Sequence, residues 1–348
     1  MQTQRPKQPL RSSHKLVEKT SVPIDPRRRG LTEDLPAPTR QGWGLVDNVD
    51  VDSALARLGL TGLDLEGAIA AAERVLSSES SRELIAGLAT EALAAWESTT
   101  PVRYFPDGDS NRHAFILATL AVLQPLAEAS LERYGVSEQV TMKTLLSTGA
   151  QVRRFRSQAG ALGVESGWWQ IYGLSGGFLA VGELHAHRIE LGTHQLGPDP
   201  WLGASHQAAR GEGFFEGDEA IGLHIPHGAD LSAGALLATF EALRDEVQRR
   251  WPTTRRRVLS IQTWMLDRQL LEHLGPDSRI VTFQSLFEPL ELHAPNNELT
   301  RRLVFGGEET PANPTRLQRV LEQLWSDGKP SRWEVGIRLL DAPHPLGK

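Results

Sequence analysis

Residues 219–251 have the sequence EAIGLHIPHGADLSAGALLATFEALRDEVQRRW, and residues 258–265 have the sequence VLSIQTWM. The apolar run Glu219–Pro226 has the length of a strand, and Val258–Met265 has the same character. Between them, Ser232–Trp251 predicts a helix, because apolar residues recur there at every third or fourth position. This apolar face carries Leu236, Phe240, Leu243 and Val247. The order strand, helix, strand indicates parallel neighbouring strands joined by a right-handed crossover.

The alternation continues toward the C-terminus. Asp267–Leu274 predicts a short helix that Gly275 and Pro276 end, and Arg279–Phe287 predicts a third strand. A later helix is expected over Pro314–Trp325 and a last strand over Arg332–Leu340. The resulting β-α-β-α-β order is typical of an α/β or α+β sheet with flanking helices.

The preceding part of the chain has a different pattern. From Val51 to about Gly149 the apolar residues recur at helical spacing, which predicts several helices. Residues 168–191 begin with aromatic residues and continue with strand-like spacing of apolar residues, so we expect a β-hairpin there. A long connection over 192–217 follows. We therefore expect an all-helical domain over residues 43–150 and a sheet-containing domain over 151–348.

Length and composition set the broad class. At about 150 residues per domain, 348 residues allow two domains. The chain has no cysteine, which excludes disulfides, zinc-thiolate sites and cysteine nucleophiles. It has neither an apolar run of membrane-spanning length nor the apolar core of a secretory signal. We expect a cytoplasmic protein without a membrane partner.

Charge is distributed unevenly along the chain. Residues 1–42 contain nine Lys or Arg and four Asp or Glu, a balance of +5, whereas the whole chain carries −6. The remaining residues therefore carry −11 and are acidic, so nucleic acid is not an expected partner. The basic, proline-containing residues 1–42 are expected to form a disordered leader.

Four short runs resemble those of bacterial acyltransferase-domain proteins. They are Gly182-Glu183-Leu184, Leu223-His224-Ile225-Pro226-His227-Gly228, Thr263-Trp264-Met265-Leu266-Asp267 and Ile280-Val281-Thr282-Phe283-Gln284. Such proteins have a helical N-terminal domain and a C-terminal domain similar to the GNAT superfamily of N-acetyltransferases. The resemblance implies a GNAT-like mixed sheet in which an acyl-CoA binds where two parallel strands splay apart. It also implies transfer of the acyl group to an amine or hydroxyl of a small acceptor, with Glu219–Pro226 and Val258–Met265 as the splayed pair.

The turn after the first of these strands is the candidate cofactor site. It contains Gly228, Ala229, Asp230, Leu231 and Ser232. Free backbone N–H groups at a helix N-terminus bind phosphate, so the pyrophosphate of CoA fits there. The alternative is that Asp230 or Ser232 simply caps the helix. Trp264 is a candidate for lining the acyl or pantetheine pocket, with core packing as the alternative, and Asp267 is expected to cap the short helix that follows it.

Three features depart from the resemblance. The family's Arg/Gln-x-x-Gly-x-Gly/Ala loop is reduced here to Gly228, and Asp230 adds negative charge. All three tyrosines, Tyr104, Tyr134 and Tyr172, precede the β-α-β-α-β stretch, so the late tyrosine that often serves as general acid has no counterpart. Gln262 stands where relatives often have a histidine. These departures keep a second hypothesis open, namely a non-catalytic GNAT-shaped binding or regulatory module.

Transfer to an amine requires a group that accepts a proton. A histidine, or a glutamate with a raised pKa, suits this role in a dry cleft. The candidates are His224, Glu183 and His227, with Glu183 expected on the same strand face as His185 and His187. A buried histidine bonded to the backbone and a solvent-facing carboxylate are the alternatives for His224 and Glu183. Without a cysteine or a Gly-x-Ser-x-Gly motif, attack on the thioester is expected to be direct.

The same histidines allow a metal-dependent enzyme. His185 and His187 followed by Glu190 resemble the first metal motif of cupins, with His224 or His227 as a further ligand. The spacing differs, because two residues separate His187 from Glu190 where a cupin usually has three or four. The long helix expected from Ser232 also has no place in a cupin barrel. A metal site is therefore disfavoured, and acyl-CoA is the expected co-substrate.

Overall fold

The computed structural model describes residues 29–30, 35–96, 103–104, 112–164, 167–191, 218–252, 258–306 and 310–341. Most of the expected leader and the whole 192–217 connection lie outside the described residues. Within the expected leader, β1 (Arg29–Gly30) pairs in parallel with β2 (Arg103–Tyr104), and α1 begins at Arg40.

The N-terminal half consists of packed helices, as the periodicity predicts. They are α1 (Arg40–Asp47), α2 (Val51–Arg57), α3 (Gly62–Leu76), α4 (Glu79–Ala95), α5 (Arg112–Arg133), α6 (Glu138–Ala159) and α7 (Gly167–Leu174). Polar side chains fix their starts: Asp50 accepts the N–H of Ser53, and Ser137 accepts the N–H of Val140. Helix α6 ends at Gly160, whose φ of 68° suits glycine. This helix continues through residue 150, where the boundary between the domains is expected.

Helix α5 is the central helix of this half. Of the helices that the structure describes, α5 is the one that is long and apolar enough to cross a membrane, and its mean hydropathy is 1.6. However, 61% of its apolar window is buried inside the protein, and α2, α3, α4 and α7 pack around it. Its apolarity is thus explained by its position in a helical core.

The C-terminal half is built on a mixed sheet with the strand order β3-β4-β5-β6-β8-β7. The strands are β3 (Phe178–Val181), β4 (Leu184–Glu190), β5 (Glu219–His224), β6 (Val258–Thr263), β7 (Glu288–Pro295) and β8 (Arg332–Leu339). Strands β5 and β6 are parallel, whereas the other neighbouring pairs are antiparallel. The predicted crossover helix is α9 (Ala233–Arg250), and the last predicted helix is α12 (Arg316–Ser326). The expected helical domain followed by a mixed sheet with flanking helices is confirmed.

Two predicted strands are wrong. Residues 168–172 belong to helix α7, so the hairpin consists only of β3 and β4. Residues 279–285 form helix α10 (Arg279–Ser285) after Ser278, and the third strand is β7. Both stretches are aromatic or β-branched, which favours strands locally, but tertiary packing overrides this preference. The short helix after Asp267 is confirmed as the 3₁₀ helix η2 (Arg268–Glu272), which η1 (Trp264–Leu266) precedes.

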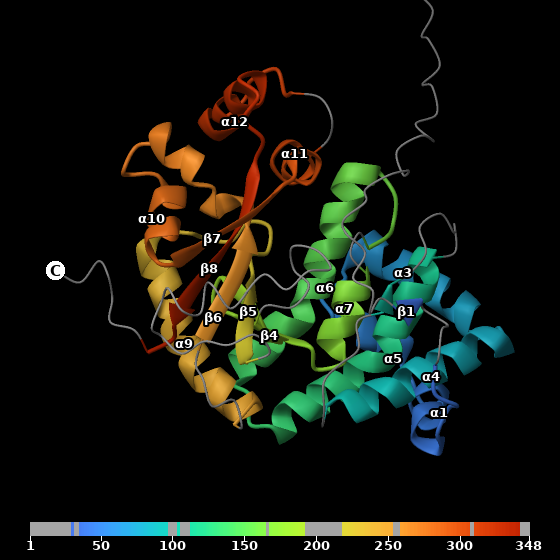
Figure 1. Cartoon of the computed structure of the whole chain (residues 1–348). Coiled ribbons are helices and arrows are strands. Elements are labelled where there is room, and N and C mark those ends of the chain that lie inside the picture. The colour runs from blue at the N-terminus through green and yellow to red at the C-terminus, as the bar shows by residue number, and fades with distance from the viewer. Residues whose placement is uncertain are drawn as a thin grey trace, which may run out of the picture.

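The two halves meet along α6, α7 and α9 (Figure 1). Helix α6 covers the edge strand β3, where Thr144 Oγ1 accepts the N–H of Ala180 at 2.9 Å. At the far end of α9, the buried guanidinium of Arg250 lies over the rings of Trp96 at 4.8 Å and Tyr134 at 4.4 Å. The same group donates to the carbonyls of Trp96 and Gly176 at 3.3 and 3.4 Å. The Arg250 side chain thus joins the sheet half to the helical half at this end of α9.

Candidate functional site

The parallel strands β5 and β6 separate at their C-terminal ends. Their pairing comprises Ile221 with Leu259, Gly222 with Ser260 and Leu223 with Ile261. Beyond this point each strand stays with its other neighbour: His224 pairs with His185 of β4, and Gln262 pairs with Val335 of β8. The described strands therefore open between His224 and Gln262. The carboxyl ends of parallel strands are where α/β sheets bind ligands.

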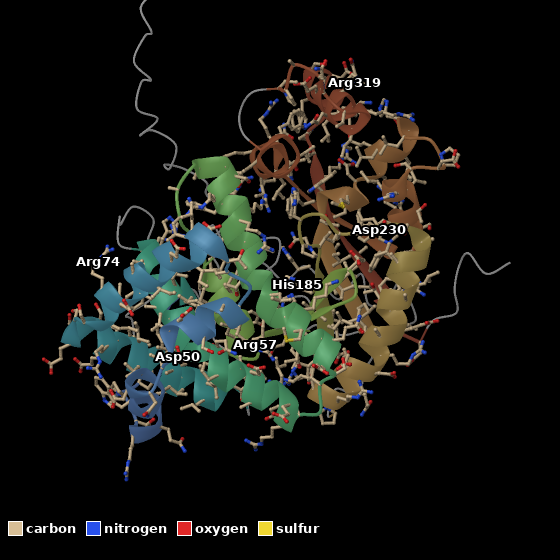
Figure 2. All side chains as sticks on the ribbon, turned by 180° about the vertical axis from the view of Figure 1, so that it is seen from behind. Asp50, Arg57, Arg74, His185, Asp230 and Arg319 are labelled. Carbon is tan, nitrogen blue, oxygen red and sulfur yellow. The ribbon has the colours of Figure 1, made fainter. Side chains whose placement is uncertain are left out.

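Three histidines lie on one face of the sheet at this opening. His185 and His187 are two residues apart on β4, so their side chains point to the same face. His224 of β5 pairs with His185 and therefore shares this face. The ring centroids of His185 and His224 are 6.0 Å apart. Near the middle of the molecule, where the helical and sheet halves meet, His185 is buried (Figure 2).

Helix α7 of the helical half covers these histidines with Trp169. The Trp169 ring lies 5.1 Å from the His224 ring and 5.4 Å from the His187 ring, and it stacks on Phe178 at 5.0 Å. Its indole N–H points to Nδ1 of His185 at 3.4 Å. Tyr172 follows three residues later on the same face of the helix, and its ring centroid lies 6.2 Å from that of His187. The site is thus assembled from both halves of the chain.

The surrounding protein keeps these imidazoles neutral. Burial lowers the pKa of both His185 and His187 to about 3, and the neighbouring His224 contributes to each shift. Desolvation also lowers the pKa of His224 to about 4. The His224 side chain is nevertheless exposed to solvent. At neutral pH the His224 imidazole is therefore unprotonated and can accept a proton.

The lowered pKa values of His185 and His187 predict acid-sensitive stability. The unfolded chain binds protons at these groups near pH 6.5, but the folded chain does so only near pH 3. Stability is therefore complete above about pH 6.5 and falls as the pH drops from 6.5 toward 3, by up to about 1.4 kcal/mol per pH unit for each histidine. In urea unfolding between pH 7.5 and 4.5, we expect His185→Gln to have a shallower pH slope than the wild type. Equal pH slopes of the wild type and His185→Gln would contradict the conclusion that His185 is buried as a neutral imidazole.

Ser260 and Gln262 share this face, since they alternate with Leu259 and Ile261 on β6. The Ser260 hydroxyl is fully buried and has no hydrogen-bond partner in the described structure. Ser260 lies beside Gly222, where a Cβ atom would come within 2.5 Å of His187 Nε2. Sequence reasoning missed Ser260, although a hydroxyl in an otherwise apolar strand is a signal that can be seen in the sequence.

The turn between β5 and α9 has the expected location. Gly228 has a φ of 83° and follows His227 in a turn in which the N–H of Ala229 bonds to the carbonyl of Pro226. Ser232 is the N-cap residue but makes no side-chain cap bond. Its N–H and hydroxyl instead donate to the Asp230 carboxylate at 2.9 and 3.0 Å. The Asp230 carboxylate also meets the Arg279 guanidinium at 3.2 Å.

The structure divides the predicted base residues between two places. His224 lies at the opening, whereas His227 is an exposed turn residue beyond the end of β5. Glu183 is not in a strand: it lies in the β3–β4 turn, and its carboxylate accepts the N–H of Asp230 at 2.8 Å. The prediction that Glu183 shares a strand row with His185 and His187 is therefore wrong.

Trp264 and Asp267 belong to packed regions. Trp264 is 5% exposed and lies in a cluster with Leu270, Leu274, Leu321 and Leu324. Leu231 is likewise buried in the main core. Asp267 caps η2 by accepting the N–H of Gln269 at 3.0 Å, which confirms its expected role, and it also accepts the N–H of Arg332.

Among the described residues, no group of three histidine, aspartate or glutamate side chains has an arrangement that could hold a metal ion.

Two family models match the chain in succession. The model of the N-acyltransferase N-terminal domain matches residues 49–176, and that of the GNAT-like C-terminal domain matches residues 185–337. No curated protein matches significantly.

Solved structures with the same fold cover most of the chain. An acyltransferase in complex with decanoyl-CoA and teicoplanin is 21% identical, with a TM-score of 0.66 over 88% of this chain and 90% of its own. An acyltransferase mutant in complex with octanoyl-CoA is 20% identical, with a TM-score of 0.68 over the same shares. A third, in complex with CoA and 10C-teicoplanin, is 21% identical with a TM-score of 0.64, again covering 88% and 90%. The chain therefore consists of an N-acyltransferase N-terminal domain followed by a GNAT-like C-terminal domain.

Proposed function

We propose that this protein transfers an acyl group from acyl-CoA to an amine or hydroxyl of a small acceptor. The observation that carries the proposal is the opening between β5 and β6, where the strand pairing stops at Leu223 and Ile261 and leaves His224 at the edge. Such an opening accommodates the pantetheine arm of CoA in the superfamily that the domain resembles. Acyl-CoA is therefore the proposed co-substrate.

The α9 N-terminus supports a phosphate position. The Ser232 side chain leaves the first N–H groups of α9 uncapped, and the helix dipole favours an anion there. Arg279 places a cation at this turn, and its ion pair with Asp230 is largely exposed, so the guanidinium can exchange one anion for another. It supplies from α10 the positive charge that the turn itself lacks.

His224 is the proposed base. At neutral pH its imidazole is unprotonated, so it can accept a proton from the attacking amine or hydroxyl. The nucleophile then forms a bond to the thioester carbonyl carbon, the carbon–sulfur bond breaks, and the thiolate leaves as CoA, which takes up a proton. Because the chain has no cysteine, no acyl-cysteine intermediate is involved. Tyr172 lies within the histidine cluster, although it precedes the sheet in sequence, and burial raises the pKa of its hydroxyl.

Calorimetry and a thiol-release assay test the proposal together. The titrants are acetyl-CoA, octanoyl-CoA and decanoyl-CoA, because similar structures hold the two longer chains. We expect micromolar binding and, with a panel of amines and hydroxyl compounds that includes teicoplanin, CoA release that depends on the acceptor. Binding without release for every acceptor would favour the alternative of a non-catalytic binding or regulatory module. Absence of binding at high micromolar concentration would contradict the proposal.

A further inference from the structure

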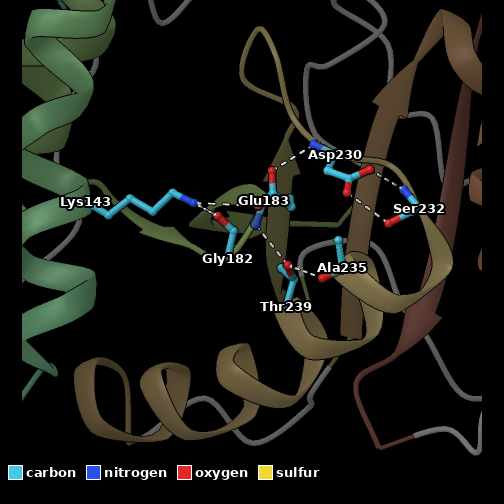
Figure 3. A network of polar contacts seen from close by, with 7 residues as sticks. All are labelled: Lys143, Gly182, Glu183, Asp230, Ser232, Ala235 and Thr239. Carbon is cyan, nitrogen blue, oxygen red and sulfur yellow. Dashed lines mark hydrogen bonds and ion pairs between the residues drawn. The ribbon is translucent and has the colours of Figure 1, made fainter.

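We propose that Glu183 is a positioning residue that fixes the β5–α9 turn for the phosphates of acyl-CoA, and that Lys143 of the helical half holds Glu183 in place. The inference rests on the proposed function. Figure 3 shows the contacts, which connect α6, the β3–β4 turn and the start of α9. Glu183 thus acts through the turn and does not touch the reacting atoms.

The first step is the contact between Glu183 and the turn. Oε2 of Glu183 accepts the backbone N–H of Asp230 at 2.8 Å. A carboxylate bonded to a backbone N–H makes a stronger bond than a neutral acceptor, so it fixes that peptide plane. With this plane fixed, the Asp230 side chain turns back to the N–H and hydroxyl of Ser232, the N-cap residue of α9.

The second step is the link to the helical half. Nζ of Lys143 on α6 donates to the carbonyl of Gly182 and lies 3.9 Å from Oε1 of Glu183. The ammonium therefore holds both the backbone and the carboxylate of the β3–β4 turn. It also offsets the negative charge that Glu183 brings near the proposed phosphate position.

The third step is the attachment of the same turn to α9. The N–H of Glu183 donates to Oγ1 of Thr239 at 2.9 Å, and the Thr239 hydroxyl donates to the carbonyl of Ala235 at 2.8 Å. Gly182 allows this approach, because a Cβ atom there would lie 2.2 Å from Thr239 Oγ1, and its φ is 51°. The side chain of Glu183 thus bonds to the turn before α9, at Asp230, and its backbone N–H bonds to α9 itself, at Thr239.

Two substitutions at one position separate the possible roles. Glu183→Leu removes the bond to the Asp230 N–H, whereas Glu183→Gln keeps an oxygen that can accept it. For Glu183→Leu we expect the Kd and KM of acyl-CoA to rise about tenfold, the loss expected for one charged hydrogen bond, with kcat within about twofold. For Glu183→Gln we expect a rise of no more than about threefold. Glu241→Leu, at an exposed position of α9, is the matched control.

Acyl-pantetheine, which lacks the nucleotide phosphates, gives a readout that a purely structural role would not produce. Glu183→Leu is expected to weaken the binding of acyl-CoA but to leave the KM of octanoyl-pantetheine unchanged. Lys143→Met is expected to weaken the binding of acyl-CoA about threefold, and it serves as the test if Glu183→Leu does not fold.

A loss of kcat in Glu183→Gln at unchanged KM would make Glu183 the base and overturn the inference. If the wild type binds acyl-CoA and both Glu183→Leu and Lys143→Met bind it equally well, the inference is wrong but the proposed function stands. If the wild type does not bind, the proposed function itself fails.

Discussion

His224→Ala is expected to lower kcat by about 10²- to 10⁴-fold, the usual contribution of a positioned general base. His224 is the described histidine at the strand opening with an accessible side chain, and its pKa of about 4 leaves it unprotonated at neutral pH. The Kd of acyl-CoA should change little, because the proposed phosphate position is the α9 turn. Steady-state thiol release and calorimetry measure the two quantities separately.

His227→Ala is the informative comparison, because this exposed histidine lies only three residues further along the chain. We expect His227→Ala to retain most of the kcat. If His227→Ala abolished turnover while His224→Ala did not, the base would lie in the turn and the site described here would be misplaced. Thermal unfolding of each variant shows whether a loss of activity reflects loss of structure.

Arg250→Met is expected to lower the free energy of unfolding by about 3 kcal/mol. The substitution removes cation–π contacts with Trp96 and Tyr134 and leaves the buried carbonyls of Trp96 and Gly176 without these donors. Arg250→Lys should be intermediate, because an ammonium keeps the charge but lacks the planar fork of donors. Urea unfolding followed by tryptophan fluorescence and by circular dichroism measures the change.

Arg244→Ala is the control on the same helix. Arg244 forms an exposed ion pair with Asp341, and such pairs contribute about 0–1 kcal/mol. If Arg250→Met cost no more than Arg244→Ala, Arg250 would not join the two halves energetically.

Local periodicity was sufficient to predict much of the fold. The helix after Ser232 and the strand at Val258 follow from apolar spacing alone, and the structure has both. Residues 168–172 and 279–287 were mistaken for strands because their aromatic and β-branched residues favour strands, whereas long-range packing decides their conformation. For α7, the three-residue interval between Trp169 and Tyr172 was the available helical signal.

The candidate site was harder to predict because its parts come from distant segments. His224 could be chosen from its strand, but its contact with Trp169 joins positions that are far apart in sequence. Glu183 was chosen for its residue type, and its place in a turn that bonds to Asp230 depends on how the hairpin packs on α9. Tyr172 lies beside His187 although it precedes the sheet in sequence, because sequence order says little about proximity in a folded chain.

A crystal structure with decanoyl-CoA tests the central claim most directly. We predict the pyrophosphate at the N–H groups of the first turn of α9, the pantetheine between β5 and β6, and the thioester carbonyl beside His224. Density for the ligand on another surface, with the opening between Leu223 and Ile261 empty, would contradict the claim.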